Sequence, residues 1–251
     1  MSGVISEIGK DVTDWQIGDR VCTLLSGGGY AERVASPASM LIRVPDDWDF
    51  EKAAAVPEVF YTAFLNLFIE GGLTKGETVL IHGGASGVGT AAIQMAKKAG
   101  CHVLVTAGRA DKIKFCKKLG ADVGVNYKED DFETAIRENA PDGVDVILDI
   151  AAADYLKPNM NLLKTGGRLV IIALLTGAKA EINLSILMRT RLRVIGSVLR
   201  PRSLKEKVDL HDRFADKIWP DLISGAINPV IYKTLPIQDA DAAHGILKAN
   251  E

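Results

Sequence analysis

The stretch Ile81-His82-Gly83-Gly84-Ala85-Ser86-Gly87-Val88-Gly89-Thr90 decides the fold class of this chain. It follows an apolar run at residues 78–82 and opens a segment with helical spacing. In that setting Gly84 permits a tight turn, while Gly87 and Val88 place backbone N–H groups at a helix N-terminus, where the helix dipole favours an anion. The stretch therefore predicts a loop that holds the phosphates of a dinucleotide.

One position of this loop departs from the usual G-x-G-x-x-G pattern, because Ser86 stands where a glycine is expected. A plain strand–turn–helix connection is the alternative interpretation of the isolated pattern. The surrounding strand and helix favour the phosphate site, and Gly89 lets the helix pack close to the sheet. The predicted cofactor contacts in the loop are Gly84, Ala85, Ser86, Gly87, Val88, Gly89 and Thr90.

Outward from the loop, strand-like and helical segments alternate between residues 74 and 199. Near-continuous apolar strands with crossover helices between them indicate a parallel sheet covered on both faces. Six such strands predict an α/β fold, a doubly wound parallel Rossmann sheet with strand order 3-2-1-4-5-6. The expected strands are residues 78–82, 102–106, 123–126, 144–148, 168–172 and 193–198, and the expected helices are about 87–99, 110–119, 130–138 and 154–163.

The end of the second strand indicates which dinucleotide the loop accepts. A site for NAD places an acidic residue about 20 residues after the glycines, where it binds the ribose 2′-hydroxyl. This chain has Arg109 and Lys112 there, and such cations suit the 2′-phosphate of NADPH. Asp111 is the counter-argument, and solvated surface charge is the alternative role for both cations. On balance the residues predict NADPH as the cofactor.

The flanking segments predict a second, partial domain. Residues 20–25, 31–35 and 40–44 are strand-like and separated by turns, so residues 1–56 are expected to form a β-rich domain. A helix after Pro57 would link it to the NADPH-binding domain, residues 57–200. Residues 201–251 are expected to return toward the first domain with a long helix at about 204–223, a strand at 230–232 and a last helix from about Asp239.

Composition argues against several classes of protein. The 251 residues are 47% hydrophobic with a formal net charge of −2, which lacks the basic surplus typical of nucleic-acid binding. No run approaches the roughly 18 apolar residues of a membrane span, and the N-terminus lacks a signal-peptide pattern. Cys22, Cys101 and Cys116 are scattered, which indicates free thiols in a reducing cytoplasm rather than disulfides or a zinc site.

Several short motifs follow one another along nearly the whole chain: Gly18-Asp19-Arg20-Val21, Gly29-Tyr30-Ala31-Glu32, Ala53-Ala54-Ala55-Val56-Pro57, Leu119-Gly120-Ala121-Asp122, Asn126-Tyr127 and Gly166-Gly167-Arg168. Each motif alone is loose, but their order and spacing are specific. With the glycine loop, they resemble the zinc-independent quinone oxidoreductase (zeta-crystallin-like) branch of the medium-chain dehydrogenase/reductase superfamily. The resemblance implies a GroES-like substrate domain at residues 1–56 and NADPH-dependent hydride transfer to a quinone or similar small electrophilic acceptor.

The resemblance also implies further contacts with the cofactor. Thr62 would lie near the nicotinamide end, Tyr127 near the adenosine 2′-phosphate, and Asn250 near the cofactor. Leu174 and Leu175 would place backbone groups on the carboxamide. Simpler roles remain open: Tyr127 as a half-buried tyrosine, the two leucines as core residues and Asn250 as a helix cap.

Some departures from the resembled family bear on activity. Its opening strands and its closing strand have no counterpart, and Ala152, Ala153 and Ala173 stand where relatives often have glycines. The extra methyl groups are expected to narrow the space beside the nicotinamide. An NADPH-binding protein with little or no turnover (a truncated isoform) and a related enal or enoyl reductase are therefore the alternatives to a quinone oxidoreductase.

The expected chemistry requires no metal and no protein acid or base, because the cofactor carries the hydride and a quinone is already electrophilic. No catalytic residue is nominated, and His82, His102, His211 and His244 are expected to be structural or surface residues. The sixth strand, residues 193–198, would lie at one edge of the sheet. A bare apolar edge invites pairing, so the sequence predicts a homodimer.

Overall fold

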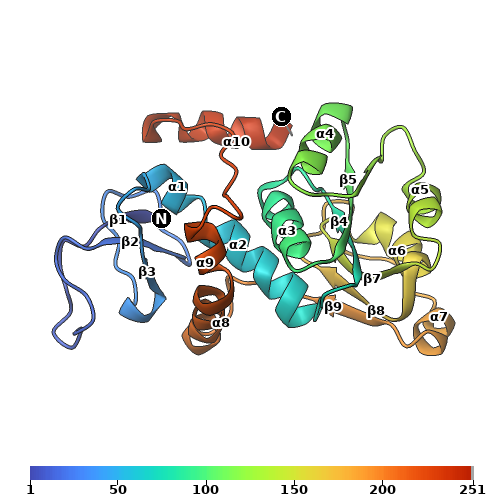
Figure 1. Ribbon diagram of the computed structural model, residues 1–251, viewed down its shortest axis with the longest axis horizontal. Helices are drawn as coiled ribbons and strands as arrows, with labels where there is room; N and C mark the ends of the chain where they lie inside the picture. The colour runs from blue at the N-terminus through green and yellow to red at the C-terminus, as the bar shows by residue number, and fades with distance from the viewer. Residues whose placement is uncertain (250–251) are drawn as a thin grey trace. The chain divides into compact units, whose positions relative to one another are not determined.

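A computed structural model describes residues 1–249, which form two compact units (Figure 1). The sheet unit is Glu58–Asn228, and the terminal unit combines Met1–Pro57 with the segment from Pro229 onward. Residues 204–223, expected in a separate C-terminal piece, therefore group with the sheet. Only the segment from Pro229 groups with the N-terminal residues.

The sheet unit is built on six parallel strands in the order β6-β5-β4-β7-β8-β9. Counted along the chain within this sheet, the order is 3-2-1-4-5-6, which confirms the predicted doubly wound α/β fold. The winding reverses between β4 and β7, and the crevice at such a switch point is where ligands bind in this architecture. The strands are β4 (Thr78–His82), β5 (His102–Ala107), β6 (Val123–Asn126), β7 (Val144–Asp149), β8 (Leu163–Ile171) and β9 (Arg193–Gly196).

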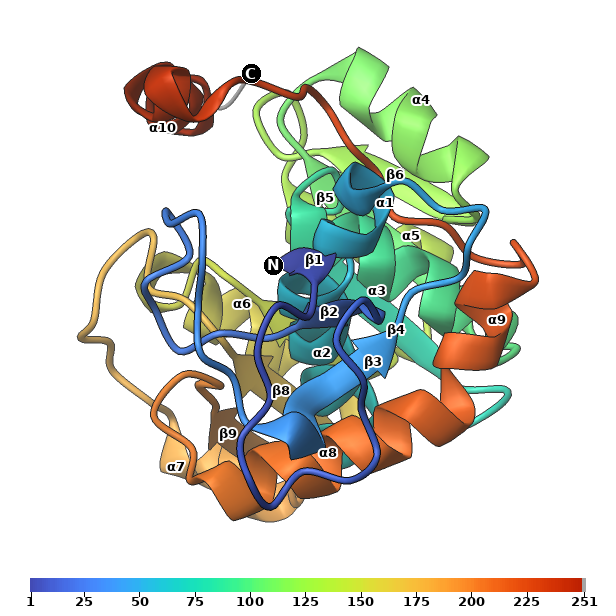
Figure 2. The same cartoon turned by 90° about the vertical axis from the view of Figure 1, so that its left-hand side faces the viewer.

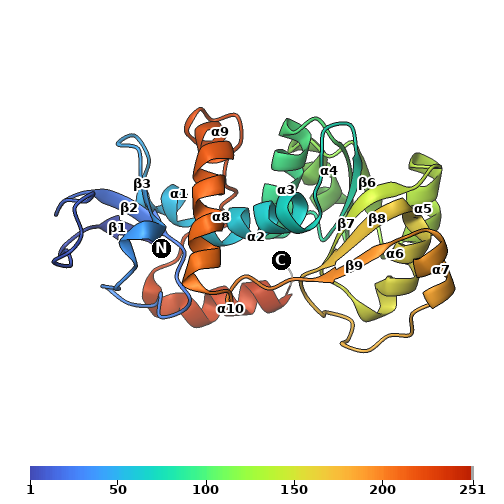
Figure 3. The same ribbon diagram turned by 90° about the horizontal axis from the view of Figure 1, so that it is seen from below.

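Helices cover both faces of the sheet, because its central strands are apolar on both sides. α3 (Gly87–Lys98) and α4 (Ala110–Lys118) lie on one face, while α5 (Phe132–Asn139) and α6 (Leu156–Leu162) lie on the other (Figures 1 and 3). The remaining helical elements that reach into this unit are α2 (Pro57–Phe64), η2 (Leu65–Glu70), η3 (Ala153–Tyr155), α7 (Leu184–Arg189), α8 (Leu204–Lys217) and α9 (Trp219–Ile223).

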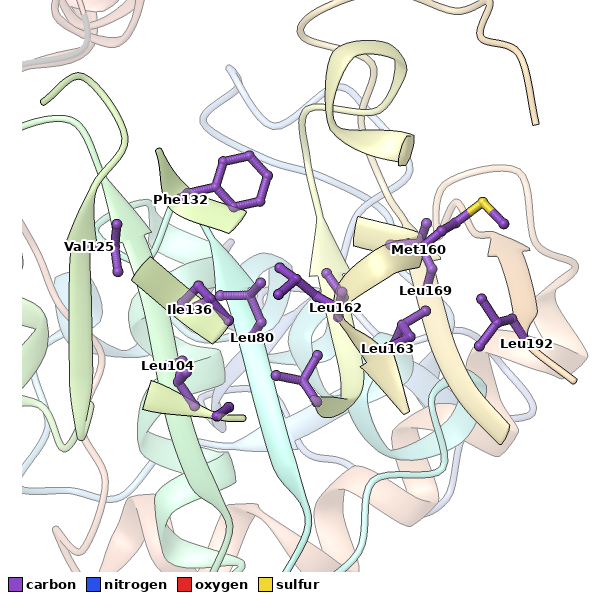
Figure 4. Close-up of a cluster of buried hydrophobic side chains, with 13 residues drawn as sticks. Leu80, Leu104, Val125, Phe132, Ile136, Met160, Leu162, Leu163, Leu169 and Leu192 are labelled. Carbon is purple, nitrogen blue, oxygen red and sulfur yellow. The ribbon is translucent and has the colours of Figure 1, made fainter. Parts of the chain in front are cut away.

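A cluster of buried hydrophobic side chains fixes α5 and α6 to the sheet (Figure 4). Leu80 and Leu104 from adjacent strands, Ile136 from α5 and Leu162 from α6 are all fully buried in it. Burying each such side chain contributes roughly 1.5–3 kcal/mol. This packing holds the carboxyl ends of the strands, where the candidate site lies, on a rigid support.

The helix expected at about 204–223 is interrupted. α8 ends at Lys217 and α9 starts at Trp219, and Figure 2 shows the chain turning between them. Pro220 stands at the start of α9. Proline has no N–H for the preceding turn and its ring collides with that turn, so one continuous helix cannot form.

By length and composition alone, one described helix, the stretch Phe50–Glu70, is apolar enough to cross a membrane. Of its most apolar window, 56% is buried inside the protein. The core helix of a soluble protein meets the same criterion, so this stretch is weak evidence for a membrane span.

The terminal unit contains a small antiparallel sheet with strand order β1-β2-β3. Strands expected at residues 31–35 and 230–232 do not form. Residues 31–35 are mostly exposed, as are Ile231 and Tyr232, so neither segment has the buried face that favours a strand. The elements of this unit are β1 (Ser2–Val4), β2 (Arg20–Thr23), η1 (Ala38–Met40), β3 (Leu41–Arg43), α1 (Phe50–Ala54), η4 (Ile237–Asp239) and α10 (Ala240–Ala249).

Candidate functional site

The glycine loop between β4 and α3 has no room for side chains at three of its glycines. Gly83 has a φ of +67°, and a Cβ there would lie 2.4 Å from Ile150 Cδ1. A Cβ on Gly84 would lie 2.8 Å from Val105 Cβ, and one on Gly89 only 2.4 Å from the Gly83 carbonyl oxygen. The loop backbone therefore packs directly on β5 and on the first turn of α3. Such a loop presents main-chain groups, rather than side chains, to a ligand.

The first turn of α3 has backbone donors available for an anion. Ser86 is the N-cap of α3, and its Oγ accepts a hydrogen bond from Gly89 N at 3.0 Å. The serine that replaces a glycine of the G-x-G-x-x-G pattern therefore caps the helix. Thr90 Oγ1 donates to the carbonyl oxygen of Gly87 at 2.9 Å. Within residues 1–249, the N–H groups of Gly87 and Val88 have no acceptor. These two donors and the helix dipole suit this helix end to a phosphate.

The predicted 2′-phosphate residues lie at the carboxyl end of β5. Arg109 is the N-cap of α4, and its guanidinium donates to Asp111 from Nε at 3.0 Å and from Nη2 at 2.7 Å. These hydrogen bonds lower the pKa of Asp111 to about 2. Lys112 lies in the same helical turn, partly buried. Arg109 thus holds an oxyanion in the bidentate geometry that a phosphate would use, and Asp111 would compete with that phosphate.

Tyr127 and Lys128 add to this end of β5. A Cβ on Gly108 would lie 2.8 Å from Tyr127 Oη and 3.2 Å from Lys128 Cε, so both side chains cover the Gly108 backbone. Tyr127 is partly buried and its N–H donates to the Ala107 carbonyl at 3.2 Å. Sequence reasoning missed Lys128. The signal available for it was its position directly after Tyr127, beyond the third strand of the sheet.

Thr62 lies on α2 within one helical turn of a residue that contacts the glycine loop. Val59 Cγ1 would be 2.9 Å from a Cβ on Gly87. One turn later, Asn66 Nδ2 donates to the Thr62 carbonyl oxygen at 2.8 Å, and Asn66 Oδ1 is buried without a partner in the described part of the chain. An unsatisfied buried acceptor is rare in folded proteins, and a ligand or a water is an ordinary way to satisfy it.

Leu174 and Leu175 follow β8 and are 57% and 74% exposed, so they are not the core residues of the simpler interpretation. Leu175 N donates to the Ile150 carbonyl oxygen at 3.2 Å, which occupies that amide. Within residues 1–249, Leu174 N has no acceptor. Of the two predicted carboxamide contacts, Leu174 therefore offers the available backbone donor. Asn250 lies outside the described residues.

The histidines and cysteines form no metal centre in the part of the chain that the structure describes, where no group of three or more His, Cys, Asp or Glu residues is suited to hold an ion. His82 is buried, His211 is buried against the hydroxyl of Tyr61 at 2.9 Å, and His102 and His244 contact polar neighbours at the surface. All three cysteines are free and buried. Burial raises the pKa of Cys22 to about 12 and that of Cys116 to about 11, so both are poor nucleophiles.

Comparisons with known proteins agree with this geometry. Residues 87–213 match the zinc-binding dehydrogenase family and residues 1–46 match the alcohol dehydrogenase GroES-like domain. The chain is 33% identical to the quinone oxidoreductase of Rattus norvegicus over 246 residues, which is 97% of this chain and 73% of the relative.

Solved structures give the same result. The quinone oxidoreductase of Escherichia coli complexed with NADPH has a TM-score of 0.89 at 28% identity, covering 99% of this chain and 77% of that one. The CurK enoyl reductase has a TM-score of 0.83 at 27% identity, covering 99% and 74%. The chain therefore belongs to the medium-chain dehydrogenase/reductase superfamily of oxidoreductases, and quinone oxidoreductases are among its homologues.

Proposed function

We propose that this protein is an NADPH-dependent quinone oxidoreductase, which transfers hydride from NADPH to a quinone or a similar small electrophilic acceptor without a metal. One observation carries the proposal: unpartnered donors at the N-terminus of α3 lie behind a glycine loop, and Arg109, Lys112 and the Tyr127 hydroxyl gather at the end of β5. The first feature suits a pyrophosphate and the second a 2′-phosphate, and together they fit NADPH.

The sheet unit has residues suited to each part of this cofactor: the pyrophosphate, the 2′-phosphate and the nicotinamide half. The backbone of residues 84–90 would hold the pyrophosphate, with Gly87 and Val88 as donors. Arg109, Lys112, Tyr127 and Lys128 would hold the 2′-phosphate. The segment with Leu174 and the α2 helix with Thr62 would receive the nicotinamide half. Bound NADPH would supply the hydride, and the chain's own task is to orient the nicotinamide and to exclude water around it.

The proposed reaction makes modest demands on the protein's own chemistry. A quinone is already electrophilic, and its reduced oxygens take protons from water, so no side chain is assigned as an acid or a base. We place the protein in the cytoplasm, where buried reduced thiols such as its three cysteines persist.

A second candidate is an enal or enoyl reductase. The similarity to the CurK enoyl reductase favours it, since the two chains share their fold over 99% of this chain. Both candidates use the same hydride donor and differ in the acceptor, which must be tested directly. A protein that binds NADPH with little turnover is the third candidate.

The decisive experiment measures NADPH oxidation with an ortho-quinone, an enal and an enoyl thioester. We expect turnover with the quinone to exceed that with the other two acceptors. Gly89→Ala should abolish NADPH binding, because its Cβ would lie 2.4 Å from the Gly83 carbonyl oxygen. Gly27→Ala is the matched control, since no atom lies within 4 Å of its Cβ.

Each other outcome selects a different function. If turnover is fastest with the enoyl thioester or the enal, the protein is a reductase of that acceptor and not of a quinone. If NADPH binds tightly but none of the three acceptors is reduced, the protein binds NADPH without turnover, which is the third candidate. Failure of the parent protein to bind NADPH contradicts the proposal as a whole.

A further inference from the structure

A chain of buried polar side chains, the His82 network, lies under the carboxyl ends of β4, β5 and β7. It comprises Thr106, His82, Asn159 and Asp149, each with at most 2% of its surface exposed. His82 Nδ1 lies 3.0 Å from Thr106 Oγ1, and His82 Nε2 lies 2.8 Å from Asn159 Oδ1. Asn159 Nδ2 donates to Asp149 Oδ2 at 3.2 Å. Burying so many polar groups is costly unless all are paired, as these are.

The hydrogen bonds of this network run in one direction. Asn159 donates from its amide N–H₂ to Asp149, which leaves its carbonyl oxygen to accept from His82. His82 then donates from Nε2 and accepts from Thr106 at Nδ1. Burial lowers the pKa of His82, which favours the neutral ring, and the Asn159 carbonyl oxygen at Nε2 selects this tautomer. Every donor in the network thus points toward the Asp149 carboxylate.

The Asp149 carboxylate fixes the loop that follows β7. Asp149 Oδ1 accepts from Ala151 N at 2.7 Å and from Ala152 N at 3.2 Å. Ala152 is held at a φ of +72°, which non-glycine residues rarely adopt. Ile150 lies against Gly83 of the glycine loop. The carboxylate therefore holds a strained backbone beside the phosphate loop.

The fixed loop is joined in turn to the segment after β8. Thr176 N and Thr176 Oγ1 both donate to the Ala151 carbonyl oxygen at 2.9 Å, and Asp154 N donates to Thr176 Oγ1 at 3.0 Å. Leu175 N donates to the Ile150 carbonyl oxygen. These bonds place Leu174, whose N–H is available, relative to the glycine loop.

We propose that Asp149, oriented by the other members of the His82 network, is a positioning residue which, through Ala151, Ala152 and Thr176, holds Leu174 in place for the nicotinamide half of the cofactor. The inference rests on the proposed NADPH site and assigns the two halves of the cofactor to different parts of that site. The adenosine half is bound by the glycine loop and the end of β5, which remain when the Thr176 contacts are removed. Damage to the positioning contacts should therefore weaken binding of the nicotinamide half alone.

The test compares two ligands, NADPH and adenosine 2′,5′-bisphosphate, which carries only the adenosine half. Thr176→Val keeps the shape of an exposed side chain and removes its hydroxyl, and with it the hydrogen bonds to the Ala151 carbonyl oxygen and from Asp154 N, so NADPH affinity should fall by about 5- to 30-fold. Asp149→Asn should lower it roughly 10- to 100-fold, because hydrogen bonds to a charged group are stronger. Thr176→Val should keep its affinity for the bisphosphate within about twofold.

Thr190→Val is the matched control, since Thr190 Oγ1 donates to the Ile186 carbonyl oxygen at 2.7 Å, outside this network. It should leave both affinities unchanged. Thr176→Val decides the result even where Asp149→Asn fails to fold. Unchanged NADPH affinity in Thr176→Val, or an equal loss for both ligands, overturns the positioning role. A parent protein that binds neither ligand overturns the NADPH site itself.

Discussion

Asp111 competes with the proposed 2′-phosphate for the guanidinium of Arg109. Both carboxylate oxygens of Asp111 accept from Arg109, at 3.0 and 2.7 Å. A guanidinium has five donors in a fixed fork, so a phosphate must share or displace this carboxylate. If the proposed site binds the 2′-phosphate, Asp111 is expected to weaken that binding.

Asp111→Asn should strengthen NADPH binding by about three- to tenfold, because the competing charge is removed while the size of the side chain is kept. NADH, which lacks the 2′-phosphate, should bind with the same affinity as before. Fluorescence titration of both cofactors measures the change. Asp142→Asn, on the loop before β7, controls for the loss of one negative charge. Equal gains for NADPH and NADH would show that Asp111 acts elsewhere.

Ala152 carries backbone strain that a glycine would remove. Its φ of +72° costs on the order of 1–3 kcal/mol for a residue with a Cβ. A glycine avoids this strain, but it loses about 0.5–1 kcal/mol more conformational entropy on folding than an alanine does. Ala152→Gly should therefore raise the free energy of unfolding by about 1 kcal/mol. Urea denaturation tests this against Ala135→Gly in α5, which should lower it by about 1 kcal/mol or more. If Ala152→Gly instead lowers the free energy of unfolding, the backbone at Ala152 is not strained in the way we infer.

At the scale of elements, the His82 network joins β4, β5, β7 and α6 through hydrogen bonds that require a neutral ring. In the unfolded chain a histidine binds a proton below about pH 6.5, whereas burial lowers the pKa of folded His82. The unfolded state then binds more protons, so stability is full above that pH and falls as the pH drops below it. Buried His211, whose pKa is also lowered by burial, adds to the effect.

We expect the free energy of unfolding to fall as the pH drops below 6.5, by at most about 1.4 kcal/mol per pH unit for each of these histidines, until the folded histidine itself binds a proton. His82→Gln should remove its share of this slope. Urea denaturation at several pH values between neutral and mildly acidic conditions measures the slope. His102→Gln, at an exposed histidine, should leave it unchanged. A His82→Gln protein with the parent's slope would be inconsistent with a neutral, buried His82.

The sequence predicts the six strands and most of the helices of the sheet unit because their apolar periodicity reflects local burial, whereas α7 and the break between α8 and α9 were not predicted. It places α3 from Gly87 because the glycines and the Ser86 cap are local signals. The strand expected at residues 230–232 fails because a strand also needs a partner, which a local pattern does not show. Lys128 and the His82 network could not be predicted for the same reason, since residues such as Asp149 and Asn159 meet only through the folded sheet.

The position of β9 in the sheet indicates how two copies of the chain could associate. This strand forms one edge of the sheet, and Val194 on it is 37% exposed. We expect a homodimer in which two β9 edges pair, since an apolar edge strand favours such pairing. Light scattering at micromolar concentration should give twice the chain mass, and Val194→Lys should shift it toward the monomer. Val230→Lys, with the same exposure, should not. A monomeric parent protein rules out this pairing.

We propose that the sheet unit binds NADPH through its phosphates, with the 2′-phosphate recognised at the end of β5. The most direct measurement is a pair of titrations of the parent protein, one with NADPH and one with NADH, at the same ionic strength. We predict a dissociation constant for NADPH at least about tenfold below that for NADH, because charge-assisted hydrogen bonds to a phosphate contribute on the order of 1.4 kcal/mol or more. Equal dissociation constants, or no binding of either cofactor, would contradict it.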